Sequence, residues 1–139
     1  MAVLGGDFAL LLQVAGNWNT LTKLEDQLEG LGKRLELVIK AHRTNPPKPA
    51  TDLLPYAVDV VALDQPGIVH NLARFFSERQ INIHEMVTNS YQASHSGSPM
   101  FSAHLTLNIK ASIRISDLRE EFAEFCDNLN LDAVIEPIK

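Results

Sequence analysis

Asp64, Gln65, Pro66 and Gly67 form a polar turn between two apolar stretches, and their types suit the binding of a small zwitterion. Glycine lets the backbone approach a ligand closely and adopt unusual dihedral angles. If a helix follows at Ile68, its first N–H groups are unpaired and lie at the positive end of the helix dipole, where a carboxylate binds. The Asp64 carboxylate would then accept from an ammonium group. A free amino acid carries both groups.

The next apolar stretch, Ile81–Ile83, contains an amide that can both donate and accept hydrogen bonds, Asn82. A purely structural explanation stays open, because any tight turn uses the same Pro and Gly and Asp64 could simply cap the helix. Residue types and spacing alone thus indicate Asp64, Gly67 and Asn82 as candidate ligand-binding residues, together with the first N–H groups of the helix.

The other reactive side chains show no spacing that is typical of a catalytic or metal site. The five histidines, His42, His70, His84, His95 and His104, do not form an HxxxH motif, and Cys126 is the only cysteine. Metal sites and nucleophilic enzymes need such clusters. We therefore expect neither an enzyme nor a cofactor or metal ion.

Hydrophobic periodicity predicts the elements that would position the turn. Strands are expected at Tyr56–Leu63, Ile81–Tyr91, Phe101–Lys110 and Leu131–Ile138, where apolar and polar residues alternate or apolar residues cluster. One helix should begin at Pro66, in its first turn, and a second should be capped by Ser116 or Asp117. The order β-α-β-β-α-β is the α+β, ferredoxin-like plan.

The first third of the chain repeats part of this plan. Residues 1–44 predict a short strand, a strand over Phe8–Val14, a helix with Leu21, Leu24, Leu28 and Leu31 inward, and a strand over Leu35–Ile39. This is a partial ββαβ unit, which we interpret as an N-terminal truncation. Residues 45–53 form a Pro-rich linker, and residues 54–139 form the complete unit. Because the Phe8–Val14 strand is apolar on both faces, we expect self-association or packing on the second unit.

Composition narrows the classes of partner. Twelve basic and seventeen acidic residues give a net charge of −5, without the basic stripe that direct nucleic-acid binding requires. No apolar run reaches the roughly 20 residues of a membrane span, and a single cysteine suits a reducing compartment. We expect a cytoplasmic protein that binds neither nucleic acid nor membrane.

The stretch "LDQPGIVHNLARFFSERQINI" resembles the signature of ACT domains, which are regulatory modules that bind amino acids. With "AGNWN" in the first unit and the "RTNPPKP" linker, the tandem layout is similar to the family of glycine cleavage system transcriptional repressors. The resemblance implies a repressor that senses a small amino acid, glycine first, and contacts a DNA-binding transcriptional activator. It places the ligand, often at a domain or subunit interface, against six residues: Asp64, Gln65, Pro66, Gly67, Ile68 and Asn82. The first unit lacks an Asp-x-Pro-Gly turn, so at most one such site per chain is expected.

Two alternatives to this sensor remain. An ACT unit can serve as a dimerisation or interaction module that holds no ligand. The chain could also be a detached regulatory domain of an enzyme of amino-acid metabolism, although no catalytic segment accompanies it.

Overall fold

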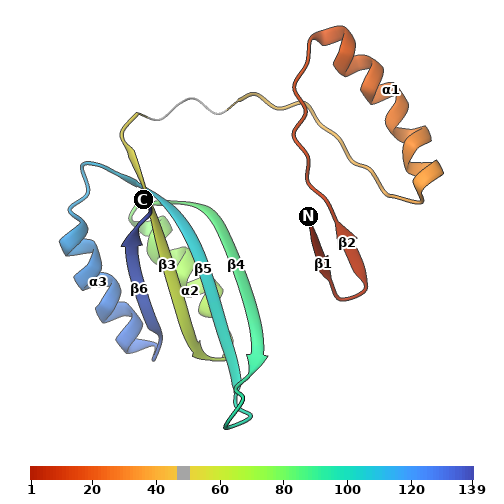
Figure 1. The fold of residues 1–139 in the computed structure, drawn as a ribbon. Coiled ribbons are helices and arrows are strands. Elements are labelled where there is room, and N and C mark those ends of the chain that lie inside the picture. Colours follow the sequence, from red (N-terminus) through yellow and green to blue (C-terminus); the bar gives the residue numbers. More distant parts are fainter. Residues whose placement is uncertain (47–50) are drawn as a thin grey trace. The chain divides into compact units, whose positions relative to one another are not determined.

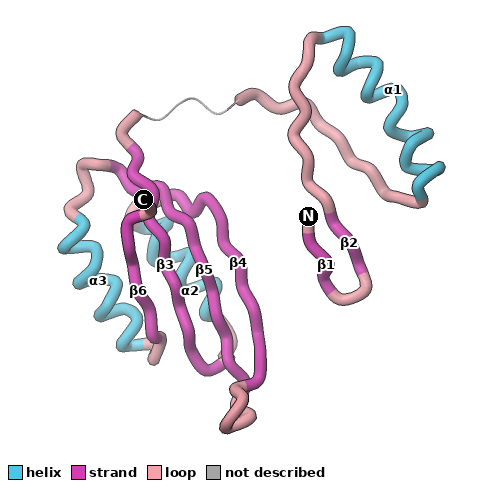
Figure 2. The backbone as a smooth tube through the Cα atoms, viewed as in Figure 1, coloured by secondary structure: helices cyan, strands magenta, loops and turns pink. Residues whose placement is uncertain are grey.

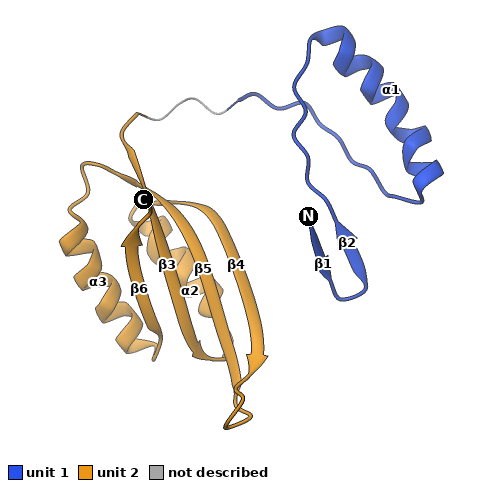
Figure 3. Cartoon of the chain, viewed as in Figure 1, with its two compact units in different colours: residues 1–47 blue, residues 48–139 orange. Residues whose placement is uncertain are grey.

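The computed structural model describes residues 1–46 and 51–139. Contacts between Cα atoms divide the chain into two units, Met1–Pro47 and Lys48–Lys139 (Figure 3), which we describe separately. Part of the predicted Pro-rich linker, residues 47–50, lies outside the described residues. Over the described ranges, no helix combines the length and apolar character needed to cross a bilayer.

The second unit is a four-stranded antiparallel sheet with two helices (Figure 1). Along the chain it contains β3 (Leu53–Leu63), α2 (Ile68–Glu78), β4 (Asn82–Gln92), β5 (Pro99–Lys110), α3 (Ile115–Asn128) and β6 (Asp132–Pro137). The strand order is β4-β5-β3-β6. This is the predicted ferredoxin-like order, and the tube in Figure 2 shows the four strands side by side.

Strand β5 explains how the sheet separates its two faces. Phe101, Ala103, Leu105, Leu107 and Ile109 are buried, whereas the residues between them are exposed or half-buried. Successive side chains of a strand point to opposite faces, so this alternation directs one face into the core. Val58, Val60 and Ala62 of β3 continue the same buried face.

Both helices cover that buried face. Leu72, Phe75 and Phe76 of α2 and Leu118, Phe122 and Cys126 of α3 belong to the same core as the strand residues. The helices also touch each other, because the rings of Phe75 and Phe122 have centroids 5.3 Å apart. Within the second unit the opposite face of the sheet therefore carries no helix.

Two predicted helix starts were wrong by a few residues. Pro66 precedes α2 instead of lying in its first turn, because Gly67 at the N-cap has φ 91° and breaks the helical geometry. Neither Ser116 nor Asp117 caps α3, since the helix already begins at Ile115 and its N-cap, Arg114, makes no side-chain cap bond. Asp117 instead lies in the first turn, where a carboxylate favours the helix dipole.

Cys126 is expected to resist thiol reagents. Its side chain is only 4% exposed, and burial raises the pKa of the thiol from 9.0 to about 11. Because the thiolate is the nucleophile, a chromogenic disulfide reagent at pH 8 should react slowly with the native chain and rapidly in denaturant. A pKa raised by folding also means that this group's contribution to stability is present below pH 9 and is lost as the pH rises toward 11. Rapid labelling of the native chain at pH 8 would contradict the buried position.

The first unit contains β1 (Ala2–Leu4), β2 (Asp7–Ala9) and α1 (Trp18–Leu35). The strand predicted over Phe8–Val14 is therefore paired only up to Ala9, where it faces β1. The strand predicted over Leu35–Ile39 does not form among the described residues. Leu35 ends the helix, and the left-handed Glu36 lets the N–H of Leu37 bond to the carbonyl of Gly32. A strand needs a neighbour for its ladder, and the described part of this unit offers none to these segments.

Little of the first unit is buried when it is taken by itself. The predicted inward residues Leu21, Leu24, Leu28 and Leu31 are half-buried, and Gly32 is the only fully buried residue among those described. Large apolar side chains such as Leu11 and Val38 remain more than nine-tenths exposed. That this surface is covered by the second unit or by another copy stays a prediction.

Candidate functional site

The predicted ligand turn connects the end of β3 to the start of α2. The N–H of Asp64 donates to the carbonyl of Pro99 at 2.9 Å, which ties the turn to the beginning of β5. Gly67 is in the left-handed region, with φ 91° and ψ −1°. This conformation favours glycine, and it turns the chain into the helix at Ile68.

The amino end of α2 has no side-chain cap. The first helical bond joins the N–H of Asn71 to the carbonyl of Gly67 at 2.9 Å, so the N–H groups of residues 68–70 have no helical partner. No acidic side chain lies in the first turn of α2. The positive end of this helix is therefore free to attract an external carboxylate.

A hollow of about 530 Å³ lies beside this helix end. It is lined by Asp64, Gln65, Gly67, Ile68, Val69, His70, Ser90 and Phe101. Four of the predicted residues share it: Asp64, Gln65, Gly67 and Ile68. The sequence analysis did not predict the other four lining residues, which are Val69, His70, Ser90 and Phe101. Ser90 of β4 is opposite Phe101 of β5 in the sheet register, and only that register brings β4 to the turn.

Asp64 has the properties that an ammonium partner requires. It is exposed, it lines the hollow, and no hydrogen bond of its carboxylate is found among the described residues. The N-cap of α2 is Gly67 and has no side-chain bond, so Asp64 does not cap the helix. Its carboxylate is left available for an external group.

Gln65 has a structural role as well as a place in the hollow. Its side-chain Nε2 donates to the carbonyl oxygen of Leu129 at 3.0 Å. Leu129 is the C-cap of α3, where carbonyl groups lack helical partners. Gln65 thus fastens the turn to the end of α3.

Asn82 is not brought to the turn within this unit. It begins β4 and is opposite Asn108, whereas the hollow lies near Ser90 and Phe101. The seven residue-to-residue steps from Phe101 to Asn108 span about 23 Å of strand. Asn82 could contact a ligand at the turn only if the turn came from another unit or copy. Pro66 also does not line the hollow, although it belongs to the same turn.

Outside the hollow, the described residues place few chemical groups together. No group of three or more His, Cys, Asp or Glu suited to a metal ion occurs in residues 1–46 and 51–139. His104 and Asp59 form an exposed pair, with 2.6 Å between Nδ1 and Oδ1.

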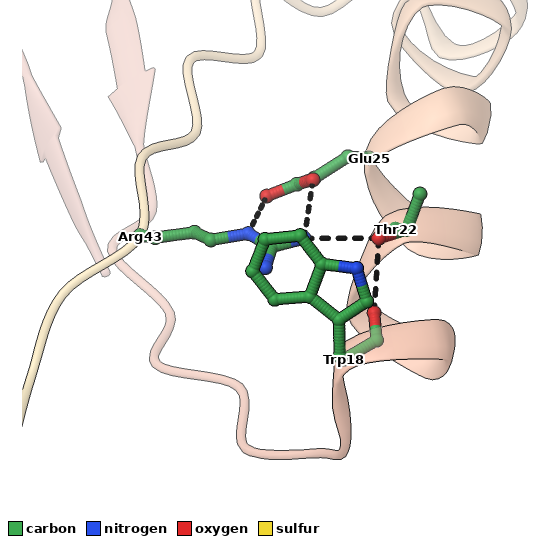
Figure 4. A network of polar contacts seen from close by, with 4 residues as sticks. All are labelled: Trp18, Thr22, Glu25 and Arg43. Carbon is green, nitrogen blue, oxygen red and sulfur yellow. Dashed lines mark hydrogen bonds and ion pairs between the residues drawn. The ribbon is translucent and has the colours of Figure 1, made fainter.

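The first unit has a polar network around Arg43 (Figure 4). The guanidinium lies 3.7 Å from the centroid of the Trp18 ring and makes two bonds, of 2.9 and 3.0 Å, to the Glu25 carboxylate. It also donates to the hydroxyl of Thr22 at 3.0 Å. These bonds lower the pKa of Glu25. They hold the segment that contains Arg43 against α1.

Residues 1–42 match the ACT domain family. The chain is also 27% identical, over 142 residues, to the glycine cleavage system transcriptional repressor of Escherichia coli strain K12. The match covers 99% of the chain and 73% of that relative, and the repressor of Shigella flexneri gives the same values. These curated relatives are transcriptional repressors and not enzymes.

Solved structures show the same fold. A crystal structure assigned to a glycine cleavage system transcriptional repressor has a TM-score of 0.69 and 24% identity, and the match covers 89% of this chain and 69% of that protein. An ACT domain protein from Streptococcus pneumoniae has a TM-score of 0.52 and 21% identity, over 60% of the chain and 89% of that protein. The ferredoxin-like ACT fold predicted from the sequence is confirmed.

Proposed function

We propose that the chain is an amino-acid-responsive regulator of transcription, of the kind of the glycine cleavage system repressors, that acts by contacting another protein. The similarity over 99% of its length to such a repressor is the observation that carries this proposal. The net charge of −5 disfavours direct contact with nucleic acid. The partner is therefore expected to be a DNA-binding activator, and the effector a small amino acid, with glycine the first candidate.

The turn at α2 supplies the groups that such a sensor needs. The unpaired N–H groups of residues 68–70 would bind the amino-acid carboxylate, and Asp64 would bind the ammonium group. A ligand shifts the population of conformations only through a difference in its affinity for them. Binding at this turn would therefore favour the conformation that the partner recognises, or the one that it does not.

The test is calorimetric titration of glycine, and then serine and alanine, into the chain at neutral pH. We expect saturable binding with at most one site per chain. Asp64→Asn should weaken binding by about 10- to 100-fold, because a hydrogen bond to a charged group contributes roughly 1.5–3 kcal/mol. The control is Asp132→Asn, which removes an exposed carboxylate from the other side of the sheet. Unchanged affinity in Asp64→Asn would refute the proposed ammonium contact.

A second candidate function is an interaction module without a ligand. The separation of Asn82 from the turn favours it, because the unit by itself does not assemble the six residues predicted for the site. The same titration separates the two functions. An absence of heat with all three amino acids would favour the module.

A further inference from the structure

The helix-free side of the second unit presents a regular grid of side chains, which we call the open sheet face. It consists of three rows across β4, β5, β3 and β6: Glu85, Thr106, Ala57 and Glu136; Val87, His104, Asp59 and Val134; Asn89, Ser102, Val61 and Asp132. Each row follows the register of the sheet, in which directly opposite residues are near neighbours. Figure 1 shows the four strands that carry it.

The charges on the open sheet face have one sign. It holds four carboxylates, those of Asp59, Glu85, Asp132 and Glu136, and none of the chain's twelve lysines and arginines. Lys110 is on the same side but lies two rows beyond Thr106, at the end of β5. Most of the net charge of −5 is therefore concentrated on this one face.

The open sheet face is partly apolar. Val61, Val87 and Val134 are 39%, 48% and 51% exposed. Between Val87 and Val134, His104 and Asp59 satisfy each other through their 2.6 Å contact. Such a pair needs no group from a partner. The three valines therefore lie around a satisfied polar pair, and the carboxylates of Glu85, Glu136 and Asp132 lie at corners of the grid. Protein interfaces combine apolar and polar side chains in this way.

The negative charge of the open sheet face indicates which class of molecule can bind it. A second copy would bring its own four carboxylates against these, and like charges across an interface cost several kcal/mol. Nucleic acid is repelled for the same reason. We propose that the open sheet face docks a protein surface on which lysines and arginines surround small apolar side chains. This inference rests on the proposed function, because it assigns the surface through which the partner would be contacted.

A contact confined to the three rows of the open sheet face is expected to be transient. The same side of the sheet continues past these rows through Tyr91, Met100 and Leu63. Three rows on four strands cover roughly 400 Å², from strand spacings of about 4.8 Å and row spacings of about 6.6 Å. Stable interfaces bury about 800 Å² on each partner. A reversible complex suits a regulator, and its electrostatic part should weaken as salt is added.

The decisive comparison uses two double variants of the full chain with equal changes in net charge. Glu85→Lys with Glu136→Lys reverses two edges of the open sheet face. Glu120→Lys with Glu124→Lys places the same charges on α3, on the helix side of the sheet. All four residues are exposed, so both variants should fold, and circular dichroism checks this.

The first probe is the peptide Arg-Ser-Val-Ser-Arg-Ser-Val-Ser-Arg, which as a strand presents Arg and Val on one side. The peptide is titrated into the full chain, and binding is followed by changes in the amide chemical shifts of the chain in NMR spectra. We expect shifts confined to the three rows, and at least about tenfold weaker binding to the sheet-face variant than to the α3 variant. Equal binding to both variants, shifts centred on α3, or no shifts at all would overturn the proposal.

The second probe is the DNA-binding activator of the glycine cleavage genes from the same genome. Binding to the wild type and the α3 variant, with loss in the sheet-face variant, supports both proposals. Equal binding to both variants refutes the open sheet face as the docking surface, but it does not contradict the proposed function. No binding of the activator, with the peptide mapping to the three rows, refutes the activator as partner and leaves the face assigned.

Discussion

Phe76→Ala is expected to lower the free energy of unfolding of the second unit by about 3–5 kcal/mol. The Phe76 side chain is fully buried, and its ring lies 5.2 Å from that of Phe75 and 5.4 Å from that of Phe122, centroid to centroid. Truncation removes the contact between Phe76 of α2 and Phe122 of α3 and leaves a cavity in the core. A domain of this size is stable by only about 5–13 kcal/mol, so much of its stability would be lost.

Chemical denaturation followed by far-ultraviolet circular dichroism measures this effect. The matched control is Ser77→Ala, an exposed change at the next residue of α2, which should alter the free energy by no more than about 0.5 kcal/mol. A loss of less than about 1 kcal/mol in Phe76→Ala would mean that the aromatic cluster is not the core of this unit.

Gly67→Val is expected to abolish amino-acid binding and also to destabilise the second unit by about 1–3 kcal/mol. A Cβ at Gly67 would lie 3.7 Å from Nδ2 of Asn71, which is an ordinary contact. The cost comes from the φ of 91°, which a β-branched residue rarely adopts. The substitution would shift the first N–H groups of α2 away from the carboxylate position. Loss of binding and loss of stability are therefore expected together.

Gly97→Val is the control variant, because it shows whether backbone strain alone is enough to abolish glycine binding. Gly97 lies in the β4–β5 loop with φ 67°, does not line the hollow, and has open space where a Cβ would be, so valine there meets a similar backbone strain outside the candidate site. We expect both variants to lose similar stability in denaturation, while only Gly67→Val loses glycine binding in calorimetry. If both lost binding, the effect would be one of stability, and the turn would not be identified as the site.

The second unit could be predicted well because its patterns are local. The alternation through β5 and the stripe of Leu72, Phe75 and Phe76 each identify an element and its buried face without knowledge of the neighbours. The first unit was harder. Its Phe8–Val14 segment has the composition of a strand, but a strand exists only where another segment completes the ladder.

The candidate site likewise has a part that local sequence predicts and a part that only the fold brings together. Residues 64–68 lie together because they are consecutive. Asn82 was assigned to them from its amide chemistry and from a family pattern, yet the eleven residues of α2 carry the chain about 16 Å along the sheet before β4 begins. The helix length alone predicts that the start of β4 is far from the start of α2. Ser90 and Phe101 could not be found in this way, because only the β4–β5 register places them at the turn.

The stacking of Arg43 on Trp18 gives the chain an optical label. Trp18 is the only tryptophan in the sequence, and it belongs to the first unit, whereas most of the strand and helix content belongs to the second. Indole fluorescence should therefore follow the opening of the Arg43–Glu25 contact, while amide circular dichroism mainly follows the four-stranded sheet and its two helices. Two midpoints in one denaturation series would show units that unfold separately, and coincident midpoints would show a single cooperative chain.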